Sequence, residues 1–207
     1  MKKLIKFVEE LKNSRVKKVV KSRMKEFEEK GRGSADEIFK ELCFCLLTAN
    51  FTAERGMKIQ EEIGDGFLNL NEKELAVKLK ELGHRFPNMR AKFIAEAKDK
   101  KDEMNLVIKT KPEKEAREWL VKNIKGLGMK ESSHFLRNIG FNNLAIIDFH
   151  IVDILEEYGL VEKPKTMNAA KYIEIENVLG KLGEKTDLKQ GELDLYLWYK
   201  ETGKILK

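Results

Sequence analysis

Apolar residues recur every three or four positions along nearly the whole chain, and no segment alternates apolar and polar residues as a strand would. Leu4, Val8 and Leu11 are the first example, because residues at this spacing share one face of an α-helix. A chain with this pattern buries its apolar stripes by packing helix against helix. We therefore predict an all-α protein of about ten to twelve short helices.

Residues with capping preferences mark where several of these helices start. Ser34 followed by Glu37 has the pattern of a capping box, and Asp148 can cap the helix that follows it. Pro112 suits a first helical position, where its missing N–H group costs no hydrogen bond. The stretch 84–88 is predicted to be a loop, because the residue that precedes a proline resists the helical region.

The composition narrows the class of protein. Of the 207 residues, 42% are hydrophobic and 37% are charged, which is typical of a folded globular protein rather than a disordered chain. No apolar run approaches the ~20 residues that span a bilayer, and the N-terminus does not resemble a secretory signal, so we expect a cytoplasmic protein with no membrane partner. The net charge of +6 fits a nucleic-acid binder but does not establish one.

A glycine hairpin, Gly126-Leu127-Gly128, separates two predicted helices. Unpaired N–H groups at the start of the second helix can bind a phosphate, and glycine lets that phosphate approach closely. Such contacts would be independent of base sequence. The alternative is an ordinary glycine that ends a helix, and the hairpin by itself favours this reading.

Lys130 and Asp148 add chemistry to the hairpin. At a helix N-terminus the dipole and desolvation disfavour the ammonium form of Lys130, and a neutral amine could attack a sugar carbon and hold the sugar as a Schiff base. The Asp148 carboxylate could stabilise positive charge on that sugar. Each residue also has an ordinary reading, a solvated lysine and a helix N-cap worth ~1 kcal/mol. The combination Gly-x-Gly-x-Lys followed by Ile-Asp-x-His is more specific than its parts.

This combination resembles the helix–hairpin–helix superfamily of DNA glycosylases. Residues 130–138, KESSHFLRN, with 147–151, IDFHI, are similar to the archaeal type of 8-oxoguanine DNA glycosylase/AP lyase, and the resemblance covers essentially the whole chain. It implies that Lys130 is the Schiff-base lysine and Asp148 the catalytic carboxylate. It also implies excision of 8-oxoguanine from duplex DNA, followed by β-elimination at the abasic site.

The resemblance implies two helical subdomains with the active-site cleft between them. One is discontinuous, 1–30 plus 112–207, and carries the N-terminal helices, the helix–hairpin–helix and the C-terminal pocket helix. The other, 31–111, carries the loops that enter DNA. We expect a monomer that acts on double-stranded DNA containing 8-oxoguanine.

Several residues are implied to contact DNA. Asn50 would fill the gap left by the flipped nucleotide and Arg55 would address the cytosine opposite, although Asn50 alone reads as a simple turn residue. Met89 would act as an apolar wedge and Arg90 would contact a base or phosphate. The resemblance also implies that Gly126, Gly128 and His150 contact DNA.

The base pocket is implied to draw on the last predicted helix. Asp194 and Trp198 share one helix face, and Trp198 would stack on the extruded base, with a core tryptophan as the alternative. Lys207 is a candidate pocket residue through its carboxylate. His134 borders the pocket or is a structural histidine.

Two other functions remain open. A non-catalytic helix–hairpin–helix module would bind DNA but has no use for Lys130 with Asp148. A glycosylase of the same fold for another damaged base, such as an oxidised pyrimidine, usually carries a C-terminal cysteine cluster, whereas the two cysteines here are Cys43 and Cys45. Catalysis needs no metal or other cofactor, although hairpins of this family often hold a monovalent cation.

Overall fold

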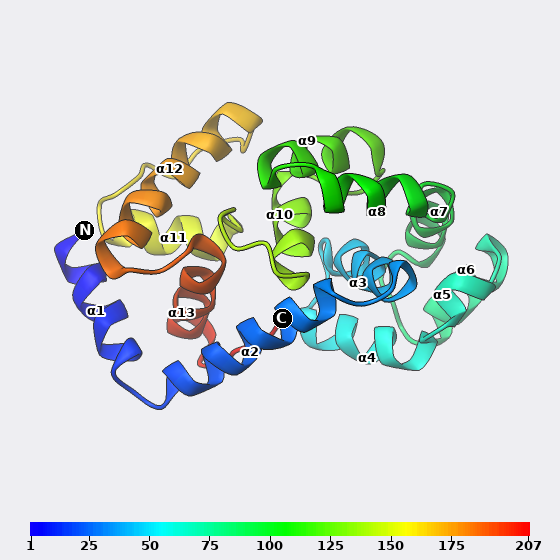
Figure 1. The fold of residues 1–207 in the computed structure, drawn as a ribbon, viewed down its shortest axis with the longest axis horizontal. Coiled ribbons are helices and arrows are strands. Elements are labelled where there is room, and N and C mark those ends of the chain that lie inside the picture. The colour runs from blue at the N-terminus through cyan, green and yellow to red at the C-terminus, as the bar shows by residue number, and fades with distance from the viewer.

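The computed structural model of the protein describes residues 1–207 and contains thirteen α-helices and no β-strand (Figure 1). The all-α prediction is confirmed. The helices are α1 (Lys2–Lys12), α2 (Val16–Gly31), α3 (Ala35–Thr48), α4 (Ala53–Ile63), α5 (Gly66–Asn69), α6 (Glu72–Glu81), α7 (Pro87–Lys98), α8 (Lys101–Thr110), α9 (Glu113–Asn123), α10 (Met129–Asn138), α11 (Phe149–Glu157), α12 (Ala169–Thr186) and α13 (Gln190–Thr202). No helix is long and apolar enough to cross a membrane.

The helix starts predicted at Ser34 and Asp148 are confirmed, whereas the predicted loop 84–88 and the start predicted at Pro112 both differ at a proline. Ser34 and Glu37 form the capping box of α3, and Asp148 caps α11. Pro87 begins α7 instead of lying in a loop, because a proline fits the first helical turn even though it constrains the residue before it. Pro112 is the residue before α9 rather than its first residue.

Helices α5 and α8 were not predicted. Helix α5 has four residues, too few for a periodic pattern. Helix α8 buries only Met104 and Ile108, while the apolar Leu106 is exposed to solvent. Its apolar residues therefore do not define one clear buried face. In both cases the surrounding helices, rather than the local pattern, stabilise the element.

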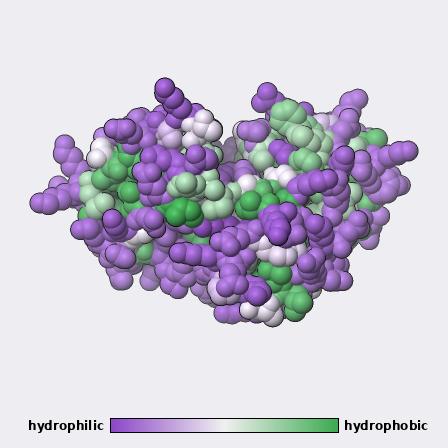
Figure 2. All heavy atoms as spheres, turned by 90° about the horizontal axis from the view of Figure 1, so that it is seen from above, coloured by the Kyte–Doolittle hydropathy of each residue, from purple (hydrophilic) through white to green (hydrophobic).

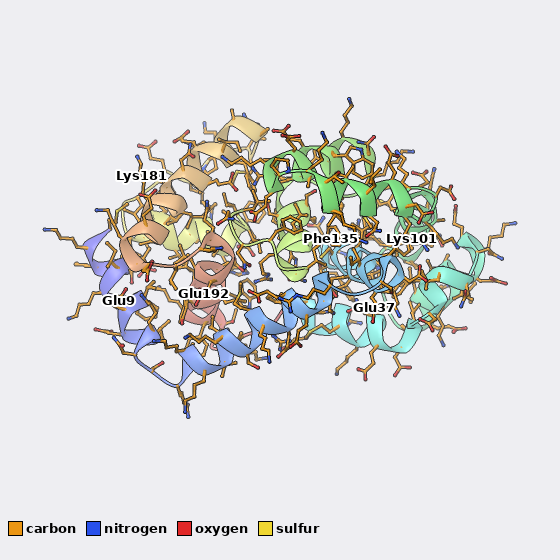
Figure 3. All side chains as sticks on the ribbon, viewed as in Figure 1. Glu9, Glu37, Lys101, Phe135, Lys181 and Glu192 are labelled. Carbon is orange, nitrogen blue, oxygen red and sulfur yellow. The ribbon has the colours of Figure 1, made fainter.

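The core divides into two large clusters. The first combines apolar side chains between positions 38 and 144, and the second combines α1 with positions 145–197. Figure 1 shows α3–α9 on one side, α1 and α11–α13 on the other, and α2 running across both. Phe135 of α10 is fully buried in the first cluster and is labelled near the centre in Figure 3. The predicted boundaries 1–30 plus 112–207 and 31–111 stay a prediction.

The surface is dominated by charged and polar residues. Figure 2 shows one face on which hydrophilic residues surround small, separate apolar patches. The largest exposed apolar side chain is Phe149, the first residue of α11, which is 74% exposed. This phenylalanine lines the cavity described next.

Candidate active site

One cavity of about 520 Å³ lies where the α3–α4 loop, the first turns of α10 and α11, helix α13 and the segment after α13 meet. Its volume is within the ~300–1,000 Å³ typical of small-molecule pockets. Eight of the predicted site residues line it: Asn50, Lys130, His134, Asp148, His150, Asp194, Trp198 and Lys207. The other five, Arg55, Met89, Arg90, Gly126 and Gly128, do not line it.

Lys130 reaches the cavity from the first turn of α10. Gly126 turns the chain with φ of +89°, and a Cβ there would lie 2.5 Å from the Phe93 ring, so glycine is required for both reasons. The backbone N–H of Gly128 donates to Glu131 Oε2 at 3.4 Å. The Lys130 side chain is 27% exposed, and its Nζ lies 3.9 Å from Glu131 Oε1. The amine is therefore accessible but held beside one carboxylate.

Asp148 enters the cavity as the N-cap of α11. Its Oδ1 accepts a hydrogen bond from the Ile151 N–H at 3.0 Å, which confirms the predicted cap. No hydrogen-bond donor approaches Oδ2 within the protein. One oxygen thus fixes the side chain and the other is available to a substrate.

A buried ion pair holds the extended segment that leads to Asp148. Arg117 of α9 binds Glu176 of α12 through two hydrogen bonds, Nη1 to Oε1 at 2.6 Å and Nη2 to Oε2 at 2.8 Å. Glu176 also accepts the Ala145 N–H at 3.0 Å. The Tyr172 hydroxyl donates to the Ala145 carbonyl at 2.8 Å and accepts from the Ile147 N–H at 3.2 Å. The backbone before Asp148 is therefore fixed by α9 and α12.

Asp194 of α13 adds a second carboxylate to the cavity. Arg137 Nη1 donates to its Oδ2 at 3.1 Å, and both side chains are largely buried. Burial raises the pKa of Asp194 to about 6, Arg137 opposes this rise, and the nearby Asp148 adds to it. Lys130 also lowers this pKa, which indicates that Lys130, Asp148 and Asp194 share one electrostatic environment.

Five ring side chains line the same cavity: Phe51, His134, Phe149, His150 and Trp198. The His150 ring is edge-on to Trp198, with centroids 5.3 Å apart and planes at 81°. The His134 ring is edge-on to Phe44 at 5.8 Å. Burial and then the charge of Arg137 lower the pKa of His134 well below its ordinary value, so its imidazole is neutral, and its Nδ1 has no hydrogen-bond partner.

The loop between α3 and α4 presents Asn50 to the cavity. Asn50 is exposed and adopts a left-handed conformation, with φ of 59°, which asparagine tolerates better than most residues. Arg90 is buried, and its Nη2 donates to the Ala49 carbonyl at 2.5 Å. Arg90 thus binds the backbone of this loop at Ala49, while its contact with DNA stays a prediction.

Two other predicted DNA contacts are exposed near this loop. Arg55 Nη2 donates to the Gly83 carbonyl at 3.1 Å, and its guanidinium lies 5.0 Å from the Phe51 ring centre. Met89, in the first turn of α7, is 43% exposed. Both are available to a ligand larger than the cavity, and their roles stay predictions.

Comparison with known proteins assigns the family. The model of the family described as 8-oxoguanine DNA glycosylase (Ogg-HhH) matches residues 20–188. The chain belongs to the 8-oxoguanine DNA glycosylase family. An 8-oxoguanine DNA glycosylase/AP lyase of Korarchaeum cryptofilum is 54% identical over 206 residues, which cover 99% of this chain and 98% of the relative.

Solved structures agree over the same length. The Methanocaldococcus jannaschii 8-oxoguanine glycosylase/lyase, crystallised with a 15mer DNA containing 8-oxoguanine, is 55% identical and superposes with a TM-score of 0.95 over 99% of both chains. The 8-oxoguanine DNA glycosylase of Thermotoga maritima is 42% identical, with a TM-score of 0.93 over 100% of this chain and 99% of the relative. The predicted family resemblance is therefore confirmed.

Sequence reasoning missed two residues that line the cavity, Arg137 and Phe149, and one that does not line it but contacts Lys207, Glu41. Arg137 lies within the segment that carries the resemblance, but nothing local indicates that its charge is buried against Asp194. Phe149 follows Asp148 directly and could have been noticed as an aromatic residue at a helix start. Glu41 follows Lys40 in α3 and so resembles an ordinary surface charge, yet it is buried and contacts Lys207.

Proposed function

We propose that this chain flips 8-oxoguanine out of duplex DNA, excises it and cleaves the resulting abasic site. The observation that carries the proposal is the position of an accessible amine, Lys130, and a carboxylate with a free oxygen, Asp148, in one cavity lined by Trp198. A base inside a duplex must leave the stack before such a cavity can receive it. The aromatic face of Trp198 would then stack on the extruded base.

The reaction follows from these groups. The Lys130 amine attacks C1′ of the sugar, a C–N bond forms, and the bond from C1′ to the base breaks with the electron pair leaving on the base, which takes a proton. Asp148 stabilises the positive charge that develops on the sugar in this step. The ring then opens, its oxygen takes a proton, and the sugar is held as a protonated Schiff base on Lys130.

Strand cleavage uses the same intermediate. The Schiff base acidifies the proton on C2′, a base removes that proton, and the 3′ phosphate leaves with the electron pair of its C–O bond. Water then hydrolyses the imine and frees Lys130. The carboxylates of Asp148 and Asp194 lie in the cavity where this proton must be accepted.

DNA is bound in this proposal by the hairpin and the loops around the cavity. The N–H groups after Gly126 and Gly128 contact a phosphate, and Asn50, Arg55 and Met89 enter the gap and the opposite strand. A monovalent cation at the hairpin, a monomeric state and a cytoplasmic location stay predictions of the family resemblance and the sequence.

Borohydride trapping tests the proposal. Reduction of the Schiff base should link the wild-type protein covalently to a duplex with 8-oxoguanine opposite cytosine. Lys130→Gln should abolish the adduct, whereas Lys122→Gln, a matched change on the exposed face of α9, should keep it. If the wild type formed no adduct with either 8-oxoguanine or abasic DNA, the lyase assignment would be wrong.

The alternatives predict different outcomes in the same assay. A non-catalytic DNA-binding module would shift the duplex in a gel without forming an adduct. A glycosylase for another damaged base would form the adduct with a duplex containing an oxidised pyrimidine in preference to one containing 8-oxoguanine. A panel of these duplexes therefore separates the three functions.

A further inference from the structure

We propose that Glu41 is a positioning residue that holds Lys207 against the cavity, and that discrimination between 8-oxoguanine and guanine depends on this contact. The inference rests on the proposed function and deepens it. Glu41 lies on α3 and does not line the cavity itself. Its effect on the base must therefore act through Lys207.

Glu41 is fully buried and accepts hydrogen bonds from four side chains on four other segments. The donors are Lys30 Nζ of α2 at 2.8 Å, Asn138 Nδ2 of α10 at 2.8 Å, Lys207 Nζ at 3.0 Å and Gln60 Nε2 of α4 at 3.3 Å. These five residues are called the Glu41 cluster. A carboxylate without solvent is costly unless it is paired and hydrogen-bonded, so the cluster is a specific arrangement.

The Glu41 cluster contains two ammonium groups for one carboxylate. Lys30 alone neutralises Glu41, and its side chain is 35% exposed, whereas the Lys207 side chain is only 10% exposed. Lys207 Nζ also donates to Gln60 and lies 4.2 Å from the centre of the Phe44 ring. Burial lowers the pKa of Lys207, and the Glu41 carboxylate opposes this shift. Glu41 thus keeps a buried ammonium in place.

The contact between Glu41 and Lys207 holds the segment after α13, which forms part of the cavity wall. Residues 203–207, called the tail, contain no helix, and Lys204, Leu206 and Lys207 line the cavity. The other ion pair of the tail, Lys204 with Glu54, is half exposed to solvent on both sides. An exposed pair contributes little to ordering a segment. Ile205 packs against the small apolar cluster around Val20 and Phe27, and the Glu41 cluster is the buried polar contact that holds the last residue of the tail.

The end of the tail is bound to helices other than α13. Lys207 is bound to α3 and α4, whereas Trp198 and Asp194 belong to α13, from which the tail departs. Loss of the Lys207 contact would leave α13 in place and release the end of the tail. The fit of a base in the cavity should then loosen, while the attack of Lys130 on a sugar that has no base should not change.

A double-mutant cycle with two substrates tests this inference. Glu41→Gln keeps the size of the side chain and removes its charge, and Lys207→Met removes the ammonium. Single-turnover excision is measured with 8-oxoguanine and with guanine opposite cytosine, and borohydride trapping is measured on preformed abasic DNA. Each variant should lower the 8-oxoguanine to guanine ratio by about ten-fold or more, and the double variant should lose no more than either one. Trapping on abasic DNA should stay within about two-fold of wild type.

Lys30→Gln is the matched control, because it removes the other cation of Glu41 and should keep the ratio. A ratio that is unchanged in Lys207→Met overturns the proposal even where Glu41→Gln fails to fold. A parallel loss of abasic-site trapping in the folded variants overturns it as well, because that result is expected from a general structural defect. Failure of the wild type to excise 8-oxoguanine would instead contradict the proposed function.

Discussion

The two sides of the cavity are held in different ways. On the reactive side, Lys130 and Asp148 stand in the first turns of α10 and α11, and the backbone between them is fixed by Glu176 and Tyr172. On the tail side, residues 203–207 contain no helix, and the Lys207 ammonium is bound to the buried Glu41 carboxylate. The comparison indicates that the proposed catalytic residues belong to the helical framework, whereas the wall proposed to contact the base is a non-helical segment attached to it.

On the reactive side, the largest loss of excision activity is expected from Asp148→Asn. Asparagine is as good an N-cap as aspartate, so α11 and the free energy of unfolding should be unchanged. The negative charge is lost, and excision of 8-oxoguanine should fall by about 100-fold or more. Single-turnover kinetics and thermal unfolding measure the two quantities. A large loss of stability would contradict the expectation that the N-cap hydrogen bond stabilises α11 while the negative charge serves catalysis.

A smaller effect on activity, with a clear effect on stability, is expected from Glu176→Gln. This change leaves the Arg117 guanidinium buried and without its ionic partner, which costs about 3–5 kcal/mol of folding free energy. Because Glu176 also fixes the Ala145 N–H, abasic-site trapping should fall with it. Urea unfolding and trapping yield check this prediction. Normal trapping in a destabilised protein would show that Asp148 does not need this support.

The smallest effect is expected from Lys204→Gln, which breaks the exposed ion pair between the tail and Glu54. The 8-oxoguanine to guanine ratio should change by no more than about two-fold, since exposed pairs contribute little. The measurement is the same single-turnover assay that is used for Glu41→Gln. A ratio as low as that of Glu41→Gln would mean that the outer pair, not the Glu41 cluster, positions the tail.

The comparison also explains what could be predicted from the sequence. The Asp148 cap, the α3 capping box and the turn at Gly126 depend on neighbours a few positions away, and all were predictable. The family resemblance then brought Lys130, Asp148 and Trp198 into one predicted site, and all three line one cavity. Their catalytic and binding roles stay predictions.

The contacts that the sequence did not reveal are long-range and charged. Glu41 meets Asn138 and Lys207 across 97 and 166 positions, so no local pattern indicates that its charge is buried. Arg90 was predicted to contact DNA, but it is buried beneath the Ala49 carbonyl, a position that depends on how α7 packs against α3. Packing of distant helices, rather than helix propensity, decides these environments.

Mapping the covalent adduct shows which amine of the protein forms the Schiff base. Wild-type protein is reduced with borohydride on a duplex containing 8-oxoguanine opposite cytosine, digested, and examined by mass spectrometry for the modified peptide. We predict a single sugar adduct, on Lys130. An adduct on another lysine, or on the N-terminal amine with Lys130 unmodified, would contradict it.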